Sequence, residues 1–223
     1  MELELKKECL DTYELGEPQT LTQEETAETI VPDYCPDIAR IISAEGVVCL
    51  HGGTEQDGVT GTVRVTVLYT PENESGVRAL EFAMPFSAQG EGLAGCAHVV
   101  VETEIELLES RMLNPRKIFT RCKLVTHLAG CRKVCLTISS DAETDPALLV
   151  EKRCCGQTVS LLRQVAEKDL TFSETMSLSL GREGAAELLH CRANGIVTET
   201  KAIGNKLIFK GVFLVSALYR TIG

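Results

Sequence analysis

The sequence contains no tryptophan, and its aromatic residues make up only 4% of the 223 positions. Sugar rings and unstacked bases are commonly bound on aromatic side chains. This scarcity therefore disfavours a glycan-binding platform and a stacking site for single-stranded nucleic acid. Hydrophobic residues nevertheless reach 44%, so the core has to be formed mainly by Val, Leu, Ile and Ala.

The sequence also lacks a run of basic residues, and its formal net charge is −10. Proteins that bind nucleic acid or an anionic membrane surface need clustered Lys and Arg side chains. No stretch approaches the roughly 18 apolar residues of a membrane span. The opening residues, MELELKKECLDTYELGEPQ, lack the apolar centre of a signal peptide. We therefore expect a cytoplasmic protein with no nucleic-acid partner and no membrane insertion.

The ten cysteines and four histidines show no spacing typical of a metal or catalytic site. Cys131 with Cys135, and Cys154 with Cys155, are the only close cysteine pairs, and neither is a CxxC pair. Residues four apart in a strand share a face, so Cys131 and Cys135 could be neighbours. In the cytoplasm we expect reduced thiols that act as small hydrophobes, with a metal or redox pair as the alternative. The sequence predicts no catalytic residue, no cofactor and no metal.

Alternation of apolar and polar residues predicts a mainly β protein with antiparallel sheets. In TGTVRVTVLYT the face predicted to be buried consists of Val63, Val65, Val67 and Tyr69. HVVVETEIELLE, KIFTRCKLVTHLAG and KVCLTIS are further expected strands, with the Glu side chains of the first on a solvated face. We expect turns at AGCR and at LGEP, the latter in an N-terminal hairpin. The predicted fold is sandwich- or barrel-like, with one or two short helices.

The segment CPDIARIISAEG, residues 35–46, predicts one of these helices. Pro36 suits a first helical turn, and Gly46 suits the end of a helix. The apolar stripe at i, i+3 and i+4 consists of Ile38, Ile41 and Ile42. Cys35 precedes this helix, where a thiolate can be stabilised. Because no histidine lies near it in the sequence, a turn that leads into a helix is favoured over a nucleophile.

The second half of the chain echoes the first. LTQEETAETIV, which begins at Leu21, matches LTFSETMSLSL, which begins at Leu170. ARIISAEGVV is echoed by ELLHCRANGIV, and GVTGTVRVTVLYT is echoed by KLIFKGVFLVSALYRT. The corresponding positions include Gly61 with Gly211, Leu68 with Leu218 and Tyr69 with Tyr219. The matched residues keep the same alternation of apolar and polar positions, so each strand has the same faces in both copies. Because the period far exceeds the roughly 20–50 residues of a solenoid repeat, a duplicated domain is indicated.

We therefore divide the chain into three parts. Residues 1–20 are expected to form an N-terminal strand or hairpin arm. Residues 21–169 form a first unit, and residues 170–223 form the first part of a second, truncated unit. Where the first unit has two prolines, the second has LGREGAAELL, so a function that depends on those prolines belongs to the first copy.

VPDYCPDIARII resembles the VP-x-x-x-PDI-x-x-I motif of the SPOCS-domain family, a bacterial family whose best-known member acts in clostridial spore-coat morphogenesis. A G-x-[VL]-x-V-x-x-LY strand and a PF pair follow. The residues that carry the resemblance are Pro32, Asp33, Pro36, Asp37, Ile38, Gly61, Leu68, Tyr69, Pro85 and Phe86, with Gly211, Leu218 and Tyr219 in the second copy. The resemblance implies a non-catalytic interaction or structural domain in spore-coat assembly, on the mother-cell side of the spore. The implied partner is a spore-coat or sporulation protein.

Two other functions stay open on the residues alone. One is a module that binds cell-wall glycan or a small ligand, against which the sparse aromatics count. The other is a cysteine-dependent activity built on Cys35 or on the pair Cys131 and Cys135. Thiol reactivity and sedimentation with peptidoglycan distinguish these functions from a protein-interaction domain.

Overall fold

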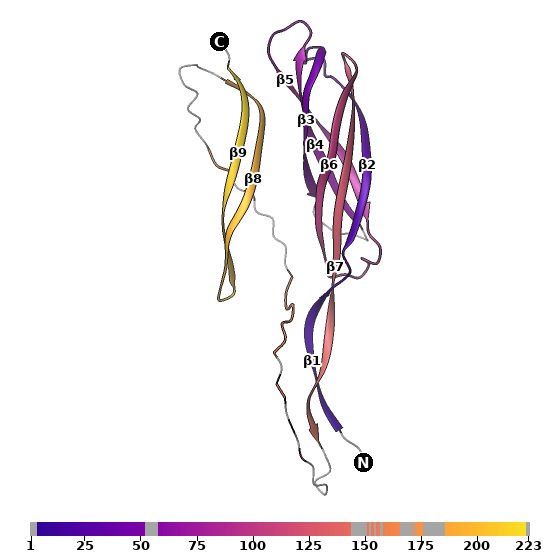
Figure 1. The fold of residues 1–223 in the computed structure, drawn as a ribbon, viewed down its shortest axis with the longest axis vertical. Coiled ribbons are helices and arrows are strands. Elements are labelled where there is room, and N and C mark those ends of the chain that lie inside the picture. The colour runs from indigo at the N-terminus through magenta and orange to yellow at the C-terminus, as the bar shows by residue number, and fades with distance from the viewer. Residues whose placement is uncertain are drawn as a thin grey trace.

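The computed structural model describes residues 4–51, 58–143 and 186–221, with parts of the segment between the last two ranges: 151, 153, 155–156, 158–165, 171 and 173–175. These residues form nine strands and no helix (Figure 1). The strands are β1 (Glu4–Leu15), β2 (Gln19–Ile30), β3 (Ile38–His51), β4 (Gly58–Pro71), β5 (Arg78–Gln89), β6 (His98–Asn114), β7 (Lys117–Glu143), β8 (Ala186–Ile203) and β9 (Lys206–Thr221). All pairings are antiparallel, as predicted.

Two sheets pack face to face as a sandwich. One contains β3, β4 and β5 in that order, and in the other β7 pairs with β1, β2 and β6. The core between them consists of Val31, Ile38, Val63, Val65, Val67, Tyr69, Leu80, Met84, Phe86, Ile118, Cys122 and Leu124. The predicted inward face of β4 is confirmed, because its four residues are all at most 1% exposed.

The outer face of the β7 sheet carries charged pairs between neighbouring strands. Arg121 Nη2 lies 2.6 Å from Glu24 Oε2, and Lys123 Nζ lies 2.8 Å from Glu106 Oε2. Lys117 also pairs with Glu28. These half-exposed pairs indicate a solvated face, as expected for the Glu side chains of β6.

The predicted helix at residues 35–46 is wrong, because β3 begins at Ile38. Register shifts occur in β3 between Ile38 and Arg40 and again between Ile41 and Ser43. Each irregularity adds a residue to the strand and changes its phase. Apolar residues three positions apart, Ile38, Ile41 and Ala44, therefore all contribute to the same core. Two bulges in one strand thus gave Ile38 and Ile41 the spacing of a helical stripe, whereas Ile42, the third residue of the predicted stripe, is 51% exposed.

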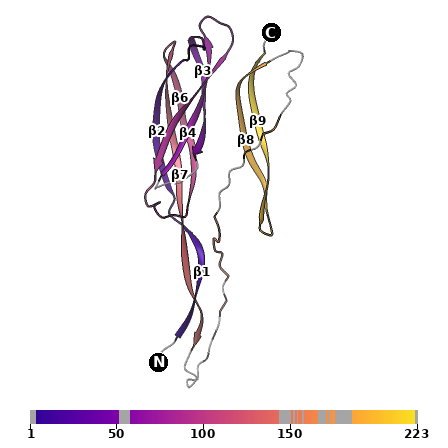
Figure 2. The ribbon, with the colours of Figure 1, turned by 180° about the vertical axis from the view of Figure 1, so that it is seen from behind.

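The predictions of an N-terminal hairpin and of a turn at AGCR are also wrong. β7 is a single strand of 27 residues that continues through residues 129–132. β1 pairs with its second half, from Leu15 opposite Cys131, and β2 pairs with its first half, from Gln19 opposite Leu128. The two N-terminal strands thus run in the same direction, one after the other along β7, and do not pair with each other. Beyond the sandwich, β1 and the end of β7 form a two-stranded ribbon (Figure 2).

The hairpin β8–β9 has the same register as β3–β4. The opposed pairs are Ile41 with Tyr69, Ser43 with Leu68 and Leu50 with Gly61 in the first hairpin, and Leu188 with Tyr219, His190 with Leu218 and Val197 with Gly211 in the second. A register shift follows the Tyr pair in both. This shared irregularity is what a duplicated hairpin predicts. Of the stretch matched to β2, residues 171 and 173–175 lie outside the strands, and residues 170, 172 and 176–180 lie outside the described residues.

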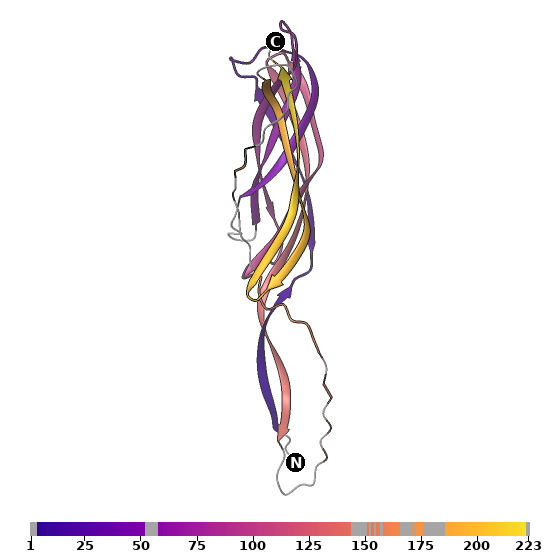
Figure 3. The ribbon, with the colours of Figure 1, turned by 90° about the vertical axis from the view of Figure 1, so that its left-hand side faces the viewer.

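β8–β9 lies beside the sandwich (Figures 1 and 3). His190 Nε2 on β8 is 3.1 Å from Glu45 Oε2 on β3. Among the described residues, β9 has β8 as its single neighbouring strand, whereas β4 lies between β3 and β5. Within the part of the chain that the structure describes, the second hairpin therefore has no counterpart of β5.

Candidate functional site

The SPOCS-like motif forms the link from β2 to β3, which we call the motif loop and define as residues 31–38. The loop crosses from one sheet to the other and is hydrogen-bonded at both ends to the turn between β6 and β7. The Val31 N–H donates to the Arg116 carbonyl and the Ile38 N–H to the Pro115 carbonyl, both at 2.9 Å. Within the loop the Cys35 N–H donates to the Pro32 carbonyl at 2.9 Å. The motif therefore specifies a sheet-to-sheet crossing.

The side chain of Arg116, from the turn between β6 and β7, is hydrogen-bonded to four residues of the motif loop. Its Nη1 donates to the Cys35 carbonyl at 2.7 Å and to Asp37 Oδ1 at 3.0 Å. Its Nη2 donates to the Val31 carbonyl and to Asp33 Oδ1, both at 3.0 Å. One guanidinium thus binds both motif aspartates and two backbone carbonyls. A Lys side chain could not replace it, because its single ammonium group lacks the planar, fixed set of donors of a guanidinium.

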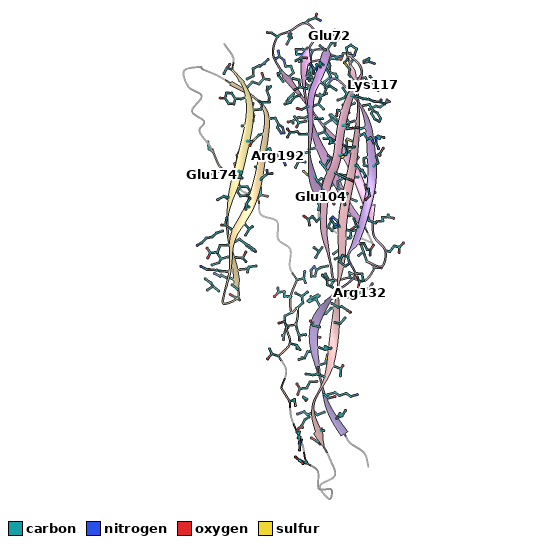
Figure 4. All side chains as sticks on the ribbon, in the orientation of Figure 1. Glu72, Glu104, Lys117, Arg132, Glu174 and Arg192 are labelled. Atoms are coloured by element: carbon teal, nitrogen blue, oxygen red, sulfur yellow. A yellow bond between two sulfur atoms is a disulfide. The ribbon has the colours of Figure 1, made fainter. Side chains whose placement is uncertain are left out.

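Tyr69 of β4 lies against the loop and contacts it at Pro36. Tyr69 is fully buried, and its hydroxyl donates to the Pro36 carbonyl at 3.4 Å. Burial, with a further contribution from Cys35, raises the pKa of Tyr69 to about 12. The Glu72 N–H donates to the Asp37 carbonyl at 2.9 Å. Figure 4 labels Glu72 and Lys117 at this end of the sandwich.

The remaining motif residues of the first copy lie along β4 and β5. Gly61 is opposite Phe86, and a Cβ at Gly61 would overlap with the Phe86 ring. Pro85 is exposed on β5, the edge strand, where a missing N–H leaves no ladder partner unpaired. Leu68 is buried on β4. These positions are explained by packing.

The three second-copy residues lie on β9. Leu218 and Tyr219 are 45% and 42% exposed, whereas Tyr69 is fully buried. A Cβ at Gly211 would overlap with the Ile196 carbonyl of β8. The structure therefore brings the first-copy motif residues together in one sandwich but leaves the second-copy residues on an open hairpin.

The outer side of the motif loop presents a small surface. Tyr34 is 88% exposed and the neighbouring Ile30 is 72% exposed. The carboxylates of Asp33 and Asp37 lie beside them, held by Arg116. This arrangement offers an aromatic ring, an aliphatic side chain and paired charge to a partner.

The cysteines do not assemble as predicted. Cys135 is joined to Cys9 of β1 in a disulfide, with 5.6 Å between the Cα atoms, while Cys131 is buried and free. The expectation of reduced thiols is therefore wrong for Cys9 and Cys135. The proposed pair of Cys131 with Cys135 is not formed, because Cys135 is bonded to Cys9. Cys35 is half-buried beside Tyr69, and Cys154 lies outside the described residues.

The described residues were also searched for a metal site, a membrane-spanning helix and a reactive thiol. No set of three His, Cys, Asp or Glu side chains there is arranged to hold a metal ion. That part of the chain also contains no long apolar helix of the kind that crosses a bilayer. The buried Cys122 has its pKa raised to about 11 by burial, with a further contribution from Glu25, so this thiol is a poor nucleophile near neutral pH.

Arg116 is the residue that sequence reasoning missed. Its only local signal is its place after Asn114 and Pro115, between two strongly alternating segments, where Asn114 Oδ1 accepts the Arg116 N–H at 2.9 Å. No family model matches the chain, and neither the curated proteins nor the solved structures give a match. The SPOCS resemblance therefore depends on the motif residues alone.

Proposed function

We propose that this chain is a non-catalytic protein-interaction domain in spore-coat assembly, with a spore-coat or sporulation protein as its partner. The observation that carries the proposal is the exposure of apolar side chains on both faces of β9. On one face these are Leu207, Phe209, Val215 and Tyr219, and on the other Ile208, Val212, Leu214 and Leu218. Contiguous exposed apolar surface of this kind marks an interaction site in soluble proteins.

Comparison with the first hairpin strengthens the argument. Val65 on β4 is 1% exposed, whereas Val215, at the same register position on β9, is 38% exposed. β4 also has Arg64 and Thr66 on its outer face, where β9 has Leu214 and Ser216. The second hairpin is thus more apolar than the first and less covered, so binding a partner would remove this surface from water at a gain of roughly 25 cal/mol per Å².

The spore-coat assignment has a separate basis, which is the SPOCS-like motif. Arg116 binds both motif carboxylates, which lie at the surface beside the exposed side chains of Tyr34 and Ile30. A loop ordered in this way presents side chains at little entropic cost on binding. We infer that the motif supports an assembly role as a scaffold, while the apolar hairpin supplies most of the contact.

The test is a pull-down with the immobilised chain and lysates from sporulating and vegetative cells of its source. A triple variant, Leu207→Ser, Phe209→Ser and Leu214→Ser, removes apolar surface from β9. A matched control, Leu136→Ser, changes an exposed leucine on the ribbon. We expect a coat or sporulation protein to be retained only from the sporulating lysate, by the unmodified chain and the control but not by the triple variant. Equal retention by the triple variant, or sedimentation with peptidoglycan in place of protein capture, would contradict the proposal.

A further inference from the structure

We propose that the contact between His190 on β8 and Glu45 on β3 is a pH-sensitive latch, which holds the hairpin β8–β9 on the sandwich and tightens as the pH falls below neutral. His190 Nε2 lies 3.1 Å from Glu45 Oε2. β8 is the hairpin strand nearer to the sandwich (Figures 1 and 2). The inference goes beyond the proposed function, because it concerns how the hairpin is placed and not what it binds.

The hairpin is docked through few contacts. Leu189, the neighbour of His190, is 6% exposed and is the one buried residue among those that the structure describes in β8 and β9. Within the described residues, no other ion pair joins the hairpin to the sandwich. Two open clefts, of about 450 and about 640 Å³, lie beside β8. Because so little holds the hairpin, one charge gained at the latch is enough to shift the balance between docked and released states.

The charges around the latch are not part of the pattern that the two hairpins share. By register, His190 of β8 corresponds to Ser43 of β3. Arg192 of β8 corresponds to Glu45 of β3. The second hairpin therefore has basic side chains where the first has a hydroxyl and a carboxylate. Complementary charges of this kind favour docking of one element on the other in a single orientation.

The surroundings of His190 carry a small excess of negative charge. The charged groups that line the two clefts with it come from β3, β4, β5, β6 and β8, and they are Glu45, Arg64, Glu81, Glu104 and Arg192. Arg192 and Glu104 are labelled on facing sides in Figure 4. The thiols of Cys49 and Cys191 also line the smaller cleft, and thiols are ordinarily neutral below about pH 8. Three carboxylates thus face two guanidinium groups, so a proton on His190 balances the charge.

Burial makes this charge count. The side chain of His190 is 15% exposed, whereas that of Glu45 is 48% exposed. An ion pair that is partly removed from water is screened less by salt than a fully exposed pair. The neutral imidazole can also donate a hydrogen bond to Glu45, so the contact persists at higher pH but without the attraction between opposite charges.

The sign of the pH dependence follows from the two states. In the docked state an imidazolium at His190 lies beside Glu45, whereas in the released state it is surrounded by water. Docking is therefore coupled to proton uptake. Since histidine side chains titrate near neutral pH, docking should strengthen as the pH falls from about 7.5 to about 5.5. The gain is lost again at a pH low enough to protonate carboxylates, ordinarily near pH 4.

The other three histidines provide controls. His51 Nε2 lies 2.7 Å from Thr62 Oγ1, and His127 Nδ1 lies 3.0 Å from Thr20 Oγ1. The ring of His98 lies beside that of Tyr13. None of these contacts involves a carboxylate. His51→Gln is the closest match, because His51 lies on β3, the strand that carries Glu45.

The test is hydrogen exchange of the full chain at about pH 5.5 and about pH 8, on either side of the range in which histidine titrates. The rates of each variant are divided by those of the unmodified chain at the same pH, so that the intrinsic pH dependence of exchange cancels. At the lower pH, His190→Gln should exchange about threefold faster across residues 187–193, the effect of a weak ion pair. At the higher pH the ratio should be close to one. Glu45→Gln should behave in the same way, and the double variant should exchange no faster than either single variant.

Three results would overturn the latch. The first is a ratio for His190→Gln that is the same at both pH values. The second is a pH-dependent effect of His190→Gln that persists when Glu45→Gln is already present. The third is an equal pH-dependent effect of His51→Gln on residues 187–193. The experiment needs no partner protein, so its failure leaves the proposed function to be decided by the pull-down.

Discussion

Arg116 Nη1 lies 3.0 Å from Asp37 Oδ1, although the two residues are 79 positions apart in the sequence. This contact links the motif loop, which crosses between the two sheets, to the turn between β6 and β7. With the bonds to the Val31 and Cys35 carbonyls, this side chain adds to the backbone hydrogen bonds that hold the loop at both ends.

Replacing Arg116 should therefore destabilise the sandwich. Arg116→Met keeps the length of the side chain but leaves two loop carbonyls and two carboxylates without their donor. We expect the free energy of unfolding to fall by about 2 kcal/mol or more, since hydrogen bonds to charged groups are individually strong. Urea denaturation measures this. Arg40→Met, on the exposed side of β3, should change it little, and an equal loss in both variants would contradict a special role for Arg116.

Adding one methyl group at Gly61 should disturb the contact between β4 and β5. Gly61→Ala brings a Cβ into the Phe86 ring and to 3.0 Å from the Cys49 carbonyl. Overpacking of this kind costs about 1–3 kcal/mol. A double-mutant cycle with Phe86→Leu should show a smaller cost for the alanine when the ring is gone. Gly156→Ala, where nothing lies within 4 Å, serves as the control, and purely additive losses would refute the predicted overlap.

Alkaline pH should weaken the fold through Tyr69. Its pKa is raised to about 12 in the folded chain, against about 10 for an unfolded tyrosine. Between these values the folded state keeps a proton that the unfolded state loses, so the free energy of unfolding falls as the pH rises from about 10 to about 12. Tyr69→Phe should flatten this fall. Urea unfolding of both proteins across that range checks it, and parallel slopes would count against the prediction.

The link between Cys9 and Cys135 should hold the ribbon and leave the sandwich unaffected. Both residues are exposed and lie on the paired strands β1 and β7. Reduction, or Cys9→Ser, should therefore speed hydrogen exchange in β1 while the exchange of β4 stays unchanged. Cys155→Ser, an exposed cysteine outside the strands, provides the control. Unchanged exchange in β1 after reduction would show that the ribbon does not depend on this bond.

Local patterns predicted the strands better than their connections. The alternation of Val63, Val65 and Val67 predicted β4 and its buried face, because period two is a property of the backbone itself. The same reasoning failed at Ile38 and Ile41, because two bulges shifted the phase of β3. It also placed a turn within residues 129–132, where pairing with β6 and β1 keeps β7 extended.

The sequence identified the loop residues of the candidate site but not the arginine that binds them. The motif identified Pro36, Asp37 and Tyr69, which do meet in the structure. The donor that explains the aspartates, Arg116, lies in a different hairpin, and nothing within a local window connects it to them. Long-range contacts of this kind depend on which strands pair, and register cannot be read from composition or spacing.

The position of β7 also has a consequence for the order in which the chain can fold. β1 and β2 are the first strands in the sequence, yet both pair with β7, which follows four other strands. The hairpins β3–β4 and β4–β5 need only short loops to close, whereas the N-terminal strands have to wait for a distant segment. Pairing across such long loops is slow. During synthesis on the ribosome, β1 and β2 would remain without their partner until β7 has emerged, and this interval is the one in which their exposed edges are open to misassembly.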